Sequence, residues 1–298
     1  MRAAPASVGY LEVVGAAMLW GSSGIWASFL FERGFNPESL ALLRPALGGV
    51  ALFAGALLWA RPSLRPGWRG FWLLAGAGGA ITALFQLAYQ RSLALSGVPT
   101  TVALLSLSPA FTLTASGPLL GEWPTPRRLA LAAVSVAGVW LTVSGVRRAD
   151  VMLDPRALGW GVTAGATYAS YTLFGRWAGP RHGPFATLLH TNFGSCVMLA
   201  VALPLAGYAI VLPTDPSGWA ILVVYSLLTR TAASVLYYDA LARIEAGRAS
   251  IFTTLEPVVA TVLATIFLHE GLEPRGWAGL AMVVGGVAGA YALARREA

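Results

Sequence analysis

Three charged residues of this 298-residue chain stand inside long apolar runs, where few charges occur. Arg44 lies near the start of one run, Arg230 lies deep in a second, and Glu256 lies in the middle of a third, directly before Pro257. An arginine in such a place can bind a carboxylate or stack on an aromatic ring. A carboxyl group there is either paired or takes up and releases protons. The residue types therefore predict a site for a small molecule, with Glu256 as its proton-coupling residue.

Polar and aromatic side chains recur at helical spacing in the same runs. Ser234 and Tyr237 follow Arg230 at i+4 and i+7, so the three share one face of a helix. Other runs carry similar polar stripes, which are Thr82, Gln86 and Tyr89; Thr163, Thr167, Ser170 and Tyr171; and Ser250, Thr253 and Thr254. The stripes predict a central wet cavity. Its candidate substrate-binding residues are Arg44, Arg230, Tyr89, Gln86, Trp20, Tyr171, Tyr237 and His190.

The composition indicates that these residues are surrounded by a lipid bilayer. The chain is 56% hydrophobic and 11% charged, whereas a soluble domain carries about 25% charged residues. The net charge of +7 does not indicate a nucleic-acid partner, because the basic residues stand mostly in short loops between apolar runs. Three His and the single Cys196 offer neither a disulfide framework nor metal-ligand spacing. No cofactor is predicted, and the lack of a Walker motif favours an ion gradient over ATP as the energy source.

Ten apolar runs predict an all-α membrane protein with about ten transmembrane helices. Each run is near the twenty residues that cross a hydrocarbon core of about 30 Å. The approximate limits of the runs in the first half are 10–30, 38–60, 70–93, 98–120 and 128–145. Those in the second half are 157–177, 184–206, 217–241, 248–268 and 276–294.

The two halves of the chain repeat one another at a fixed offset. Pro257 and Pro109 are 257 − 109 = 148 positions apart. The same offset relates Glu270 to Glu122, Pro274 to Pro126, Arg275 to Arg127, and Tyr237 to Tyr89. Because each half holds an odd number of spans, the second half enters the membrane from the opposite side, which makes an inverted repeat. The predicted divisions are a short N-terminus at 1–9, a first five-helix repeat at 10–145, a linker at 146–156, a second five-helix repeat at 157–294 and a C-terminus at 295–298.

Pro109 and Pro257 occupy equivalent places inside two of the predicted spans. Each proline removes one backbone hydrogen bond and clashes with the preceding turn, so each span is expected to bend or break there. Backbone carbonyls freed at membrane depth are tolerated where they line a cavity. The two prolines are therefore the predicted hinges, and an ordinary membrane kink is the alternative.

The arginines predict the orientation of the chain in the membrane. With a cytoplasmic N-terminus, the cytoplasmic segments hold Arg2, Arg61, Arg65, Arg69, Arg127, Arg128, Arg176, Arg181, Arg243, Arg248, Arg295 and Arg296. The outer loops then hold Arg33, Arg147, Arg148, Arg156 and Arg275. This excess on one side favours a multi-pass protein of the inner (plasma) membrane with both termini in the cytoplasm.

Structural interpretations stay open for the charged and small residues. Arg44 can extend its guanidinium to the membrane surface, Arg230 can form a buried ion pair between helices, and Glu256 can accept hydrogen bonds around the proline. The hydroxyl stripes can join helices by hydrogen bonds worth only about 0.6 kcal/mol each. A further set of small residues permits close helix contact, either inside the molecule or in a homodimer: Ala281, Gly285 and Gly289, with Ala133 and Ala137.

Five short segments carry a resemblance to a known family. They are Leu19-Trp-Gly-Ser-Ser, Leu42-Leu-Arg-Pro-Ala, Leu105-Ser-Leu-Ser-Pro, Gly121-Glu and Leu255-Glu-Pro-Val-Val. Together they resemble the EamA family of the drug/metabolite transporter superfamily over nearly the whole chain. The resemblance implies ten helices in two five-helix EamA repeats, and transport of small metabolites, often export of amino acids or related compounds. The chain departs from the family pattern at His269-Glu270-Gly271, and around His190, where the second copy lacks an equivalent of Arg44.

Two other classes of function fit single features of the sequence. Gly21-Ser-Ser-Gly24 resembles the nucleophile motif of rhomboid proteases, so an intramembrane serine hydrolase would use Ser23 with His190 as its base. The internal repeat argues against this interpretation. A passive channel would be expected to show a ring of carbonyls or charges, and the sequence shows none. The favoured hypothesis is therefore a non-enzymatic carrier of small molecules, with amino acids among the candidate substrates.

Overall fold

The computed structural model describes residues 6–145, 154–267 and 273–297, and over these residues all the regular secondary structure is helical. The first half contains α1 (Ala6–Gly21), α2 (Ser23–Glu32), α3 (Pro37–Trp59), η1 (Arg61–Leu64), α4 (Trp68–Phe71), η2 (Trp72–Gly78), α5 (Gly79–Leu105), α6 (Ser108–Leu120) and α7 (Pro126–Ser144). The second half contains α8 (Pro155–His182), α9 (Pro184–Leu205), α10 (Pro216–Tyr225), η3 (Ser226–Ala232), α11 (Ala233–Arg243), α12 (Ala246–Phe252), α13 (Leu255–Phe267) and α14 (Pro274–Glu297). The expected all-α class is confirmed.

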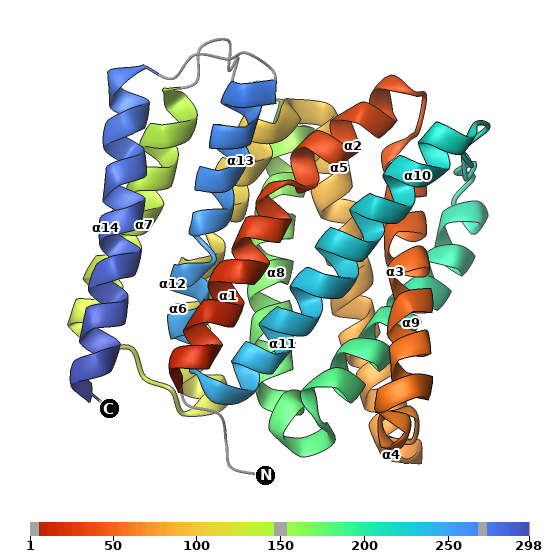
Figure 1. Ribbon diagram of the computed structural model, residues 1–298, viewed down its shortest axis with the longest axis horizontal. Helices are drawn as coiled ribbons and strands as arrows, with labels where there is room; N and C mark the ends of the chain where they lie inside the picture. The colour runs from red at the N-terminus through yellow and green to blue at the C-terminus, as the bar shows by residue number, and fades with distance from the viewer. Residues whose placement is uncertain (1–5, 146–153, 268–272, 298) are drawn as a thin grey trace.

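Nine helical segments of the described chain are long and apolar enough to cross a membrane. The 28-residue helix α8 is as long as the others but more polar. α8 runs through the middle of the bundle beside α5 (Figure 1), where many of its residues are buried against protein. With α8, the described residues supply the ten spans of two five-helix repeats.

Proline-containing turns start four of the long helices at defined residues. Asn36 accepts a hydrogen bond from the backbone N of Ser39 at 2.7 Å, directly before Pro37. The same arrangement begins α7 with Thr125, α8 with Asp154 and α10 with Asp215. A side-chain oxygen at this position satisfies a backbone donor of the first turn, and proline at the first helical position loses no hydrogen bond.

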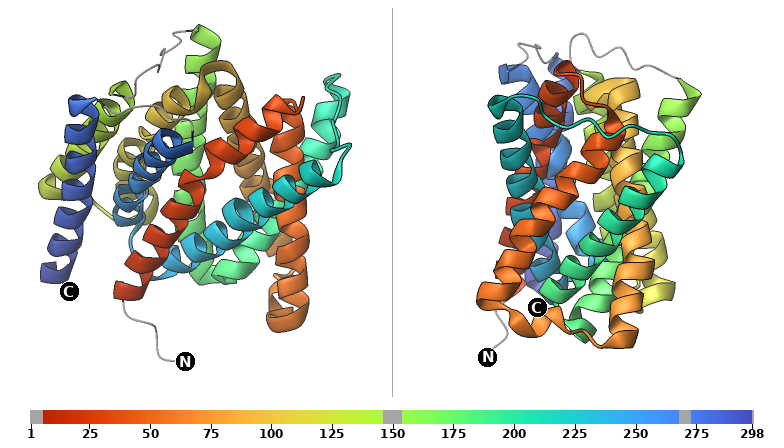
Figure 2. Two further views of the ribbon diagram at one scale, coloured as in Figure 1. Left: turned by 45° about the horizontal axis from the view of Figure 1, so that its top comes forward. Right: turned by 90° about the vertical axis from the view of Figure 1, so that its right-hand side faces the viewer.

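The helices form one bundle in which α7 and α14 pair at one edge and α3 and α9 lie toward the other (Figures 1 and 2). Gly138 and Gly279 let the backbones of α7 and α14 meet, because a Cβ on Gly138 would lie 2.8 Å from the carbonyl oxygen of Gly279. Of the predicted small-residue face, Gly289 packs on Leu131 of α7. The remaining positions of that face, which are Ala133, Ala137, Ala281 and Gly285, are exposed.

The fourth and ninth spans are each broken in two at symmetry-related positions. α5 ends at Leu105 and α6 begins at Ser108, while α12 ends at Phe252 and α13 begins at Leu255. Pro109 and Pro257 then stand in the first turn of the second half of each span, which explains why the helices restart there. The two broken spans and α8 enclose a cavity of about 10 Å³, roughly the room of one water molecule.

The third and fourth predicted spans are joined more tightly than the sequence suggested. A loop was expected between residues 93 and 98, whereas helical hydrogen bonding continues through a reversal at Gly97, where φ is 72°. Only glycine adopts this left-handed backbone readily. The third and eighth spans also each contain a π-helical segment, η2 and η3, which the sequence did not predict.

The first residues of α1 and the last residues of α14 lie at the same end of the bundle, as an even number of crossings requires (Figure 1). Arg65, between η1 and α4, lies at this end, and Thr214, before α10, lies at the other; both side chains are exposed. For a chain with cytoplasmic termini, we expect an impermeant maleimide to label Thr214→Cys in intact cells, and Arg65→Cys only after permeabilisation. The background is Cys196→Ser. Reversed accessibility would invert the orientation, and equal accessibility of both positions would contradict the bundle.

Candidate functional site

A buried cluster of aromatic and polar side chains fills the centre of the bundle. It joins Trp20 of α1, Tyr89 and Gln86 of α5, Tyr171 of α8, and Tyr237 of α11, with exposed fractions between 0% and 8%. All five were predicted from the sequence as substrate-binding residues. Because every one of these side chains is buried, the structure shows the cluster closed to both ends of the bundle. Whether these residues bind a substrate stays a prediction.

The rings of the cluster contact one another continuously across four helices. Tyr171 and Tyr237 stack with centroids 6.3 Å apart and an interplanar angle of 4°. Trp20 meets Tyr237 edge-on at 5.0 Å and Tyr168 at 5.7 Å, and Phe85 stacks on Tyr168 at 5.2 Å. Rings of this kind accept both apolar groups and cations on their faces. The cluster is therefore suited to a ligand that carries an apolar or aromatic part.

Arg44 reaches into this cluster from α3 and is only 3% exposed. Its Nη1 donates to the hydroxyl of Tyr225 at 2.9 Å, and Gln90 Nε2 donates to the same hydroxyl at 3.0 Å. Its guanidinium carbon lies 5.0 Å from the centre of the Tyr225 ring and 6.0 Å from that of Tyr89. This burial excludes extension to the membrane surface, which was the alternative interpretation of Arg44.

Arg230 stands in the π-helical segment η3 and is 2% exposed. The expected alternative, a buried ion pair, is absent from the described residues. Instead, Nε of Arg230 donates to Oδ1 of Asn192 at 2.6 Å, and Nδ2 of Asn192 donates to the carbonyl of Pro45 at 2.9 Å. Asn192 therefore ties Arg230 to the helix that carries Arg44.

Two consecutive glycines of α3 make room for this arrangement. A Cβ on Gly48 would lie 2.9 Å from Cγ of Arg230, and a Cβ on Gly49 would lie 2.6 Å from Nδ2 of Asn192. Gly48 follows Arg44 by four residues, so both arginines lie along one face of α3, about one turn apart. The two glycines thus let the side chains of Arg230 and Asn192 lie directly against the helix that carries Arg44.

Glu256, in the first turn of α13, is buried with 6% of its surface exposed. It has no arginine within ion-pair distance among the described residues. The hydroxyl of Tyr168 approaches Oε2 at 3.4 Å, a long hydrogen bond, and Glu256 borders the small cavity between the broken spans. Nearby, a Cβ on Gly21 would lie 2.9 Å from the Glu256 carbonyl oxygen, so the break between α1 and α2 packs against this point.

Several buried polar atoms of the cluster have no hydrogen-bond partner among the described residues. They are Arg44 Nε, Arg230 Nη2, both amide atoms of Gln86, Gln90 Oε1, Ser234 Oγ, and the hydroxyls of Tyr171 and Tyr238. Buried polar groups in native proteins are nearly always paired. A concentration of unpaired atoms around one cluster is what a site built for a polar ligand or for water would leave.

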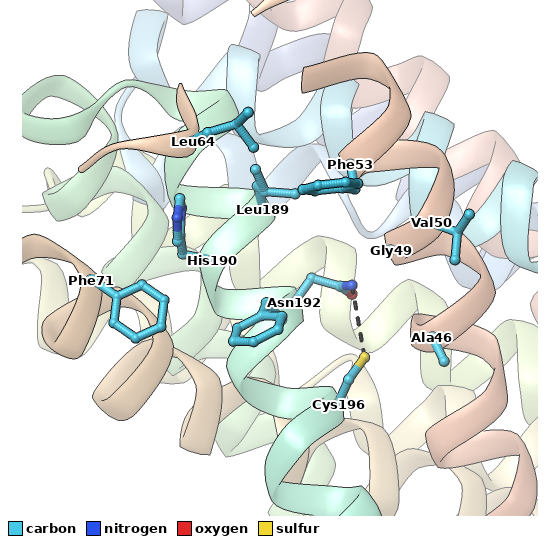
Figure 3. A pocket seen from close by; sticks show the side chains of 11 residues that line it. Ala46, Gly49, Val50, Phe53, Leu64, Phe71, Leu189, His190, Asn192 and Cys196 are labelled. Atoms are coloured by element: carbon cyan, nitrogen blue, oxygen red, sulfur yellow. Dashed lines mark hydrogen bonds between the residues drawn. The ribbon is translucent and has the colours of Figure 1, made fainter. Parts of the chain in front are cut away.

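His190 is not part of this cluster, although the sequence grouped it with the substrate-binding residues. It lies in a lateral groove of about 510 Å³ between α3 and α9, beside Phe71 and Asn192 (Figure 3). Its Nδ1 is 2.9 Å from the carbonyl of Ala186 in its own helix, and its ring meets that of Phe71 edge-on at 5.8 Å. The residues that line the groove are mostly apolar, and His190 lies on the side of the bundle, outside the central cluster.

The proposed serine–base pair is likewise not assembled. Ser23 is buried in α2, and His190 faces the lateral groove on α9 with its Nδ1 at a backbone carbonyl. No hydrogen bond joins the two described side chains. A hydrolase needs contact between nucleophile and base, so the arrangement does not support the hydrolase hypothesis.

Of the polar stripe predicted in the sixth span, Tyr171 reaches the cluster, and the three hydroxyl residues do not. The hydroxyls of Thr163, Thr167 and Ser170 donate to carbonyls four residues earlier in the same helix. The residues that reach the cluster are Tyr168 and Tyr171. Tyr168 was missed, although it precedes Tyr171 by three residues and so shares its helical face.

The site is built from pairs of residues related by the internal repeat. The offset of 148 relates Trp20 to Tyr168, Gln86 to Ser234 and Tyr89 to Tyr237, all of them buried. It also relates Arg44 to Asn192, since 192 − 44 = 148. Asn192 was missed for this reason: the second copy holds an amide, not a charge, where the first holds its arginine.

Ion pairs close the end of the bundle at which α1 begins and α14 ends. Glu122 accepts from Nε of Arg176 at 2.6 Å and from the backbone N of Ala246 at 2.8 Å, which caps the first turn of α12. Glu12 and Asp239 both pair with Arg243 at 2.6 Å. The repeat partner Glu270, with its neighbours 268–272, lies outside the described residues, as do Arg2, Arg147 and Arg148.

The opposite end is closed by a smaller contact. Arg91 pairs with Glu38 at 2.7 Å, and its guanidinium lies 5.0 Å from the ring of Trp160 and 4.8 Å from that of Tyr208.

The described residues contain no group of three His, Cys, Asp or Glu side chains suited to a metal ion. The chemistry available at the centre is therefore that of two guanidinium groups, one carboxyl group, amides, hydroxyls and rings.

Comparisons with known proteins agree with this architecture. The sequence profile of the EamA-like transporter family matches residues 7–144 and again residues 155–292. The two matches stand at the offset of the internal repeat, since 155 − 7 = 148 and 292 − 144 = 148. A crystal structure whose chain is 21% identical superposes with a TM-score of 0.82 over 98% of this chain and 99% of the other, which shows the same fold.

Similar proteins over nearly the full length are bacterial transporters. The uncharacterized transporter YwfM of Bacillus subtilis is 25% identical over 96% of this chain and 95% of its own length. The uncharacterized inner membrane transporter YicL of Salmonella typhimurium is 26% identical over 94% and 93%. The threonine/homoserine exporter RhtA of Escherichia coli is 26% identical over a shorter stretch, 55% of this chain and 54% of the exporter.

Proposed function

Because the chain belongs to the EamA-like transporter family, we propose that it is a secondary-active carrier that exports amino acids or related small metabolites. In this proposal the carrier lies in the inner membrane with both termini in the cytoplasm. Its two halves rock about the central cluster, so that the cluster opens alternately to either side. The energy comes from an ion gradient, with Glu256 as the group that takes up and releases a proton.

One observation carries the proposal: a closed polar cluster lies between two inverted halves. Arg44 and Tyr89 come from the first half, and Arg230, Tyr237 and Glu256 come from the second. A movement of one half against the other therefore changes the surroundings of every group in the cluster. That is the geometry that alternating access requires.

Amino acids are the favoured substrates for two reasons. The cluster offers two guanidinium groups for a carboxylate, and rings for a side chain or an ammonium group. RhtA, which is similar over about half of this chain, is named as a threonine/homoserine exporter. Neither reason selects one amino acid, so the first experiment is a screen.

The proposal is tested by expression in a strain that lacks its own exporters. Cells that express the chain are expected to resist toxic amino acids or their analogues, and purified protein in liposomes is expected to exchange the same compound by counterflow. If folded protein exchanges none of the compounds to which it gives resistance, the carrier proposal fails. Product release from a substrate in detergent, where no second compartment exists, would indicate an enzyme instead.

The prolines provide a test of the rocking movement. Pro109→Ala and Pro257→Ala each restore a backbone donor, which can then bond to the carbonyl four residues earlier and straighten the broken span. A straighter span favours one conformation and leaves the other rarely populated. We expect each variant to transport about tenfold more slowly, with equilibrium substrate binding largely kept. Transport rates in liposomes and equilibrium binding in detergent measure the two quantities separately.

The proline prediction has a matched control in the same helix. Pro118→Ala alters the proline of α6 that lies away from the break, so its transport rate is expected to stay near that of the wild type. Wild-type rates in both test variants would remove the prolines from the mechanism. Lost binding in folded protein would make them residues of the binding site.

A further inference from the structure

The charges at the centre of the bundle do not balance. Arg44 and Arg230 have no carboxylate partner among the described residues, and Glu256 is the carboxyl group that borders the cluster. Other carboxylates in the spans pair with arginines away from the centre: Glu38 with Arg91, and both Glu12 and Asp239 with Arg243. The centre therefore carries a charge of +1 when Glu256 is ionised and +2 when it is protonated.

An uncompensated charge in this position is unfavourable. The cluster is buried on all sides by protein that lies at membrane depth, where charged groups occur in pairs or beside water. The hydrogen bonds of Arg44 and Arg230 go to the neutral groups of Tyr225 and Asn192. These bonds orient the guanidinium groups and leave their charge uncompensated.

Each guanidinium also keeps one free donor. Arg44 Nε and Arg230 Nη2 are buried without a partner among the described residues. Both guanidinium groups face the same aromatic cluster, because that of Arg44 lies 6.0 Å from the ring centre of Tyr89 and that of Arg230 lies 5.9 Å from the ring centre of Tyr171. Carboxylates match such donors well, because a guanidinium binds them through directed, charge-assisted hydrogen bonds.

From these observations we infer that the substrate carries a net negative charge. A zwitterionic amino acid brings a carboxylate and an ammonium group, and so leaves the excess positive charge in place. A molecule of net charge −1, such as an acidic amino acid or an organic acid with an apolar part, neutralises the centre while Glu256 is ionised. The inference rests on the proposed carrier function and narrows its substrate class.

The test compares molecules of equal shape that differ by one charge. The first pair is glutamate and glutamine, and the second is phenyllactate and phenylalanine. Purified protein is assayed for binding by the shift of its melting temperature in detergent, and for transport by counterflow in liposomes. We expect the anionic member of at least one pair to bind and exchange about tenfold better or more, because one unpaired unit charge in a buried site outweighs that factor.

A second measurement changes the charge of the site and leaves the substrates unchanged. Asn192→Asp is nearly isosteric and puts a carboxylate beside Nε of Arg230, where Asn192 Oδ1 lies at 2.6 Å. The preference for the anionic member is expected to fall by about tenfold. Glu256→Gln removes a negative charge and is expected to increase the preference. Glu38→Gln is the control, since it removes a buried carboxylate that pairs with Arg91 at one end of the bundle, and it should keep the wild-type preference.

The outcomes separate the inference from the carrier proposal. Preference for the neutral or zwitterionic member in both pairs, with exchange still measured, would overturn the inference alone. Anion-selective binding without exchange would support the inference and contradict the carrier proposal. Equal preferences in the wild type, Asn192→Asp and Glu256→Gln would overturn the inference, and stabilisation by chloride alone, without discrimination within the pairs, would do so too. A folded chain that binds none of the four probes, but exchanges a zwitterionic compound found in the resistance screen, would overturn the inference and keep the carrier proposal.

Discussion

Arg44→Ala and Arg230→Ala are each expected to lower transport by about 30-fold or more, while the chain still inserts into the membrane. Truncating one partner of a buried, charge-assisted contact costs about 2–5 kcal/mol, and 1.4 kcal/mol is a factor of ten. Both guanidinium groups keep a free donor in the central cluster. In the proposed carrier, removal of either therefore takes away one of the two guanidinium groups that are predicted to contact the substrate. Counterflow in liposomes measures the loss.

Two comparisons show whether the arginines act on the substrate. Arg→Lys at either position is expected to give little recovery, because an ammonium group lacks the planar fork of donors. Arg33→Ala, at the exposed end of α2, is the control and should transport normally. If the two Ala variants instead yield no folded protein in detergent, the arginines are structural. A structural role is the main alternative for Arg230, because its hydrogen bond to Asn192 joins two helices.

The second large effect is expected from Glu256→Gln, which should abolish accumulation driven by a proton gradient and leave exchange of substrate in place. Glutamine keeps the size of the side chain but cannot change its charge. Glu256 is buried beside Tyr168 and lacks an arginine partner among the described residues, so proton uptake is its available means of changing charge at membrane depth. Uptake into liposomes with an imposed pH difference, compared with counterflow without one, separates the two activities.

The outcome can also exclude this role for Glu256. Gradient-driven accumulation that persists in Glu256→Gln would assign coupling to another group or another ion. Loss of both activities in folded protein would make Glu256 a substrate contact. Glu38→Gln, at the outer pair with Arg91, is the matched control, since it removes a buried carboxylate at one end of the bundle and not at its centre.

Much of the architecture could be predicted from the sequence because it depends on pattern. A long apolar run in a bilayer is expected to form a transmembrane helix, because a helix satisfies its own backbone polar groups. A repeat at a fixed offset with an odd number of spans per half requires the second half to be inverted. The breaks beside Pro109 and Pro257 arise from the missing backbone donor. Arg44, Arg230 and Glu256 could be identified because charges are rare in such runs and are buried only where something else satisfies them.

The orientation of individual side chains was harder to predict, for physical reasons visible in α8. Thr163, Thr167 and Ser170 bond to their own helix, so their polarity carried no information on which face meets the cluster. Where a π-helical segment such as η3 interrupts a span, the extra residue per turn rotates the later turns of the helix about its axis. His190 lies in the lateral groove and not in the central cluster, and the sequence contained no signal that distinguishes these two surroundings.

The unequal pairing of Arg44 with Asn192 across the repeat has a kinetic consequence for the proposed carrier. If the halves had identical residues, its inward- and outward-facing states would be related by two-fold symmetry and would have equal affinity. The unequal pair gives each side its own half-saturation concentration. The Haldane relation then ties the ratio of those concentrations to the rates of reorientation, so the final gradient still depends on the coupled ion alone. Selection can therefore adjust the half-saturation concentration on each side of the membrane to the substrate concentration present there. The final substrate gradient would not change.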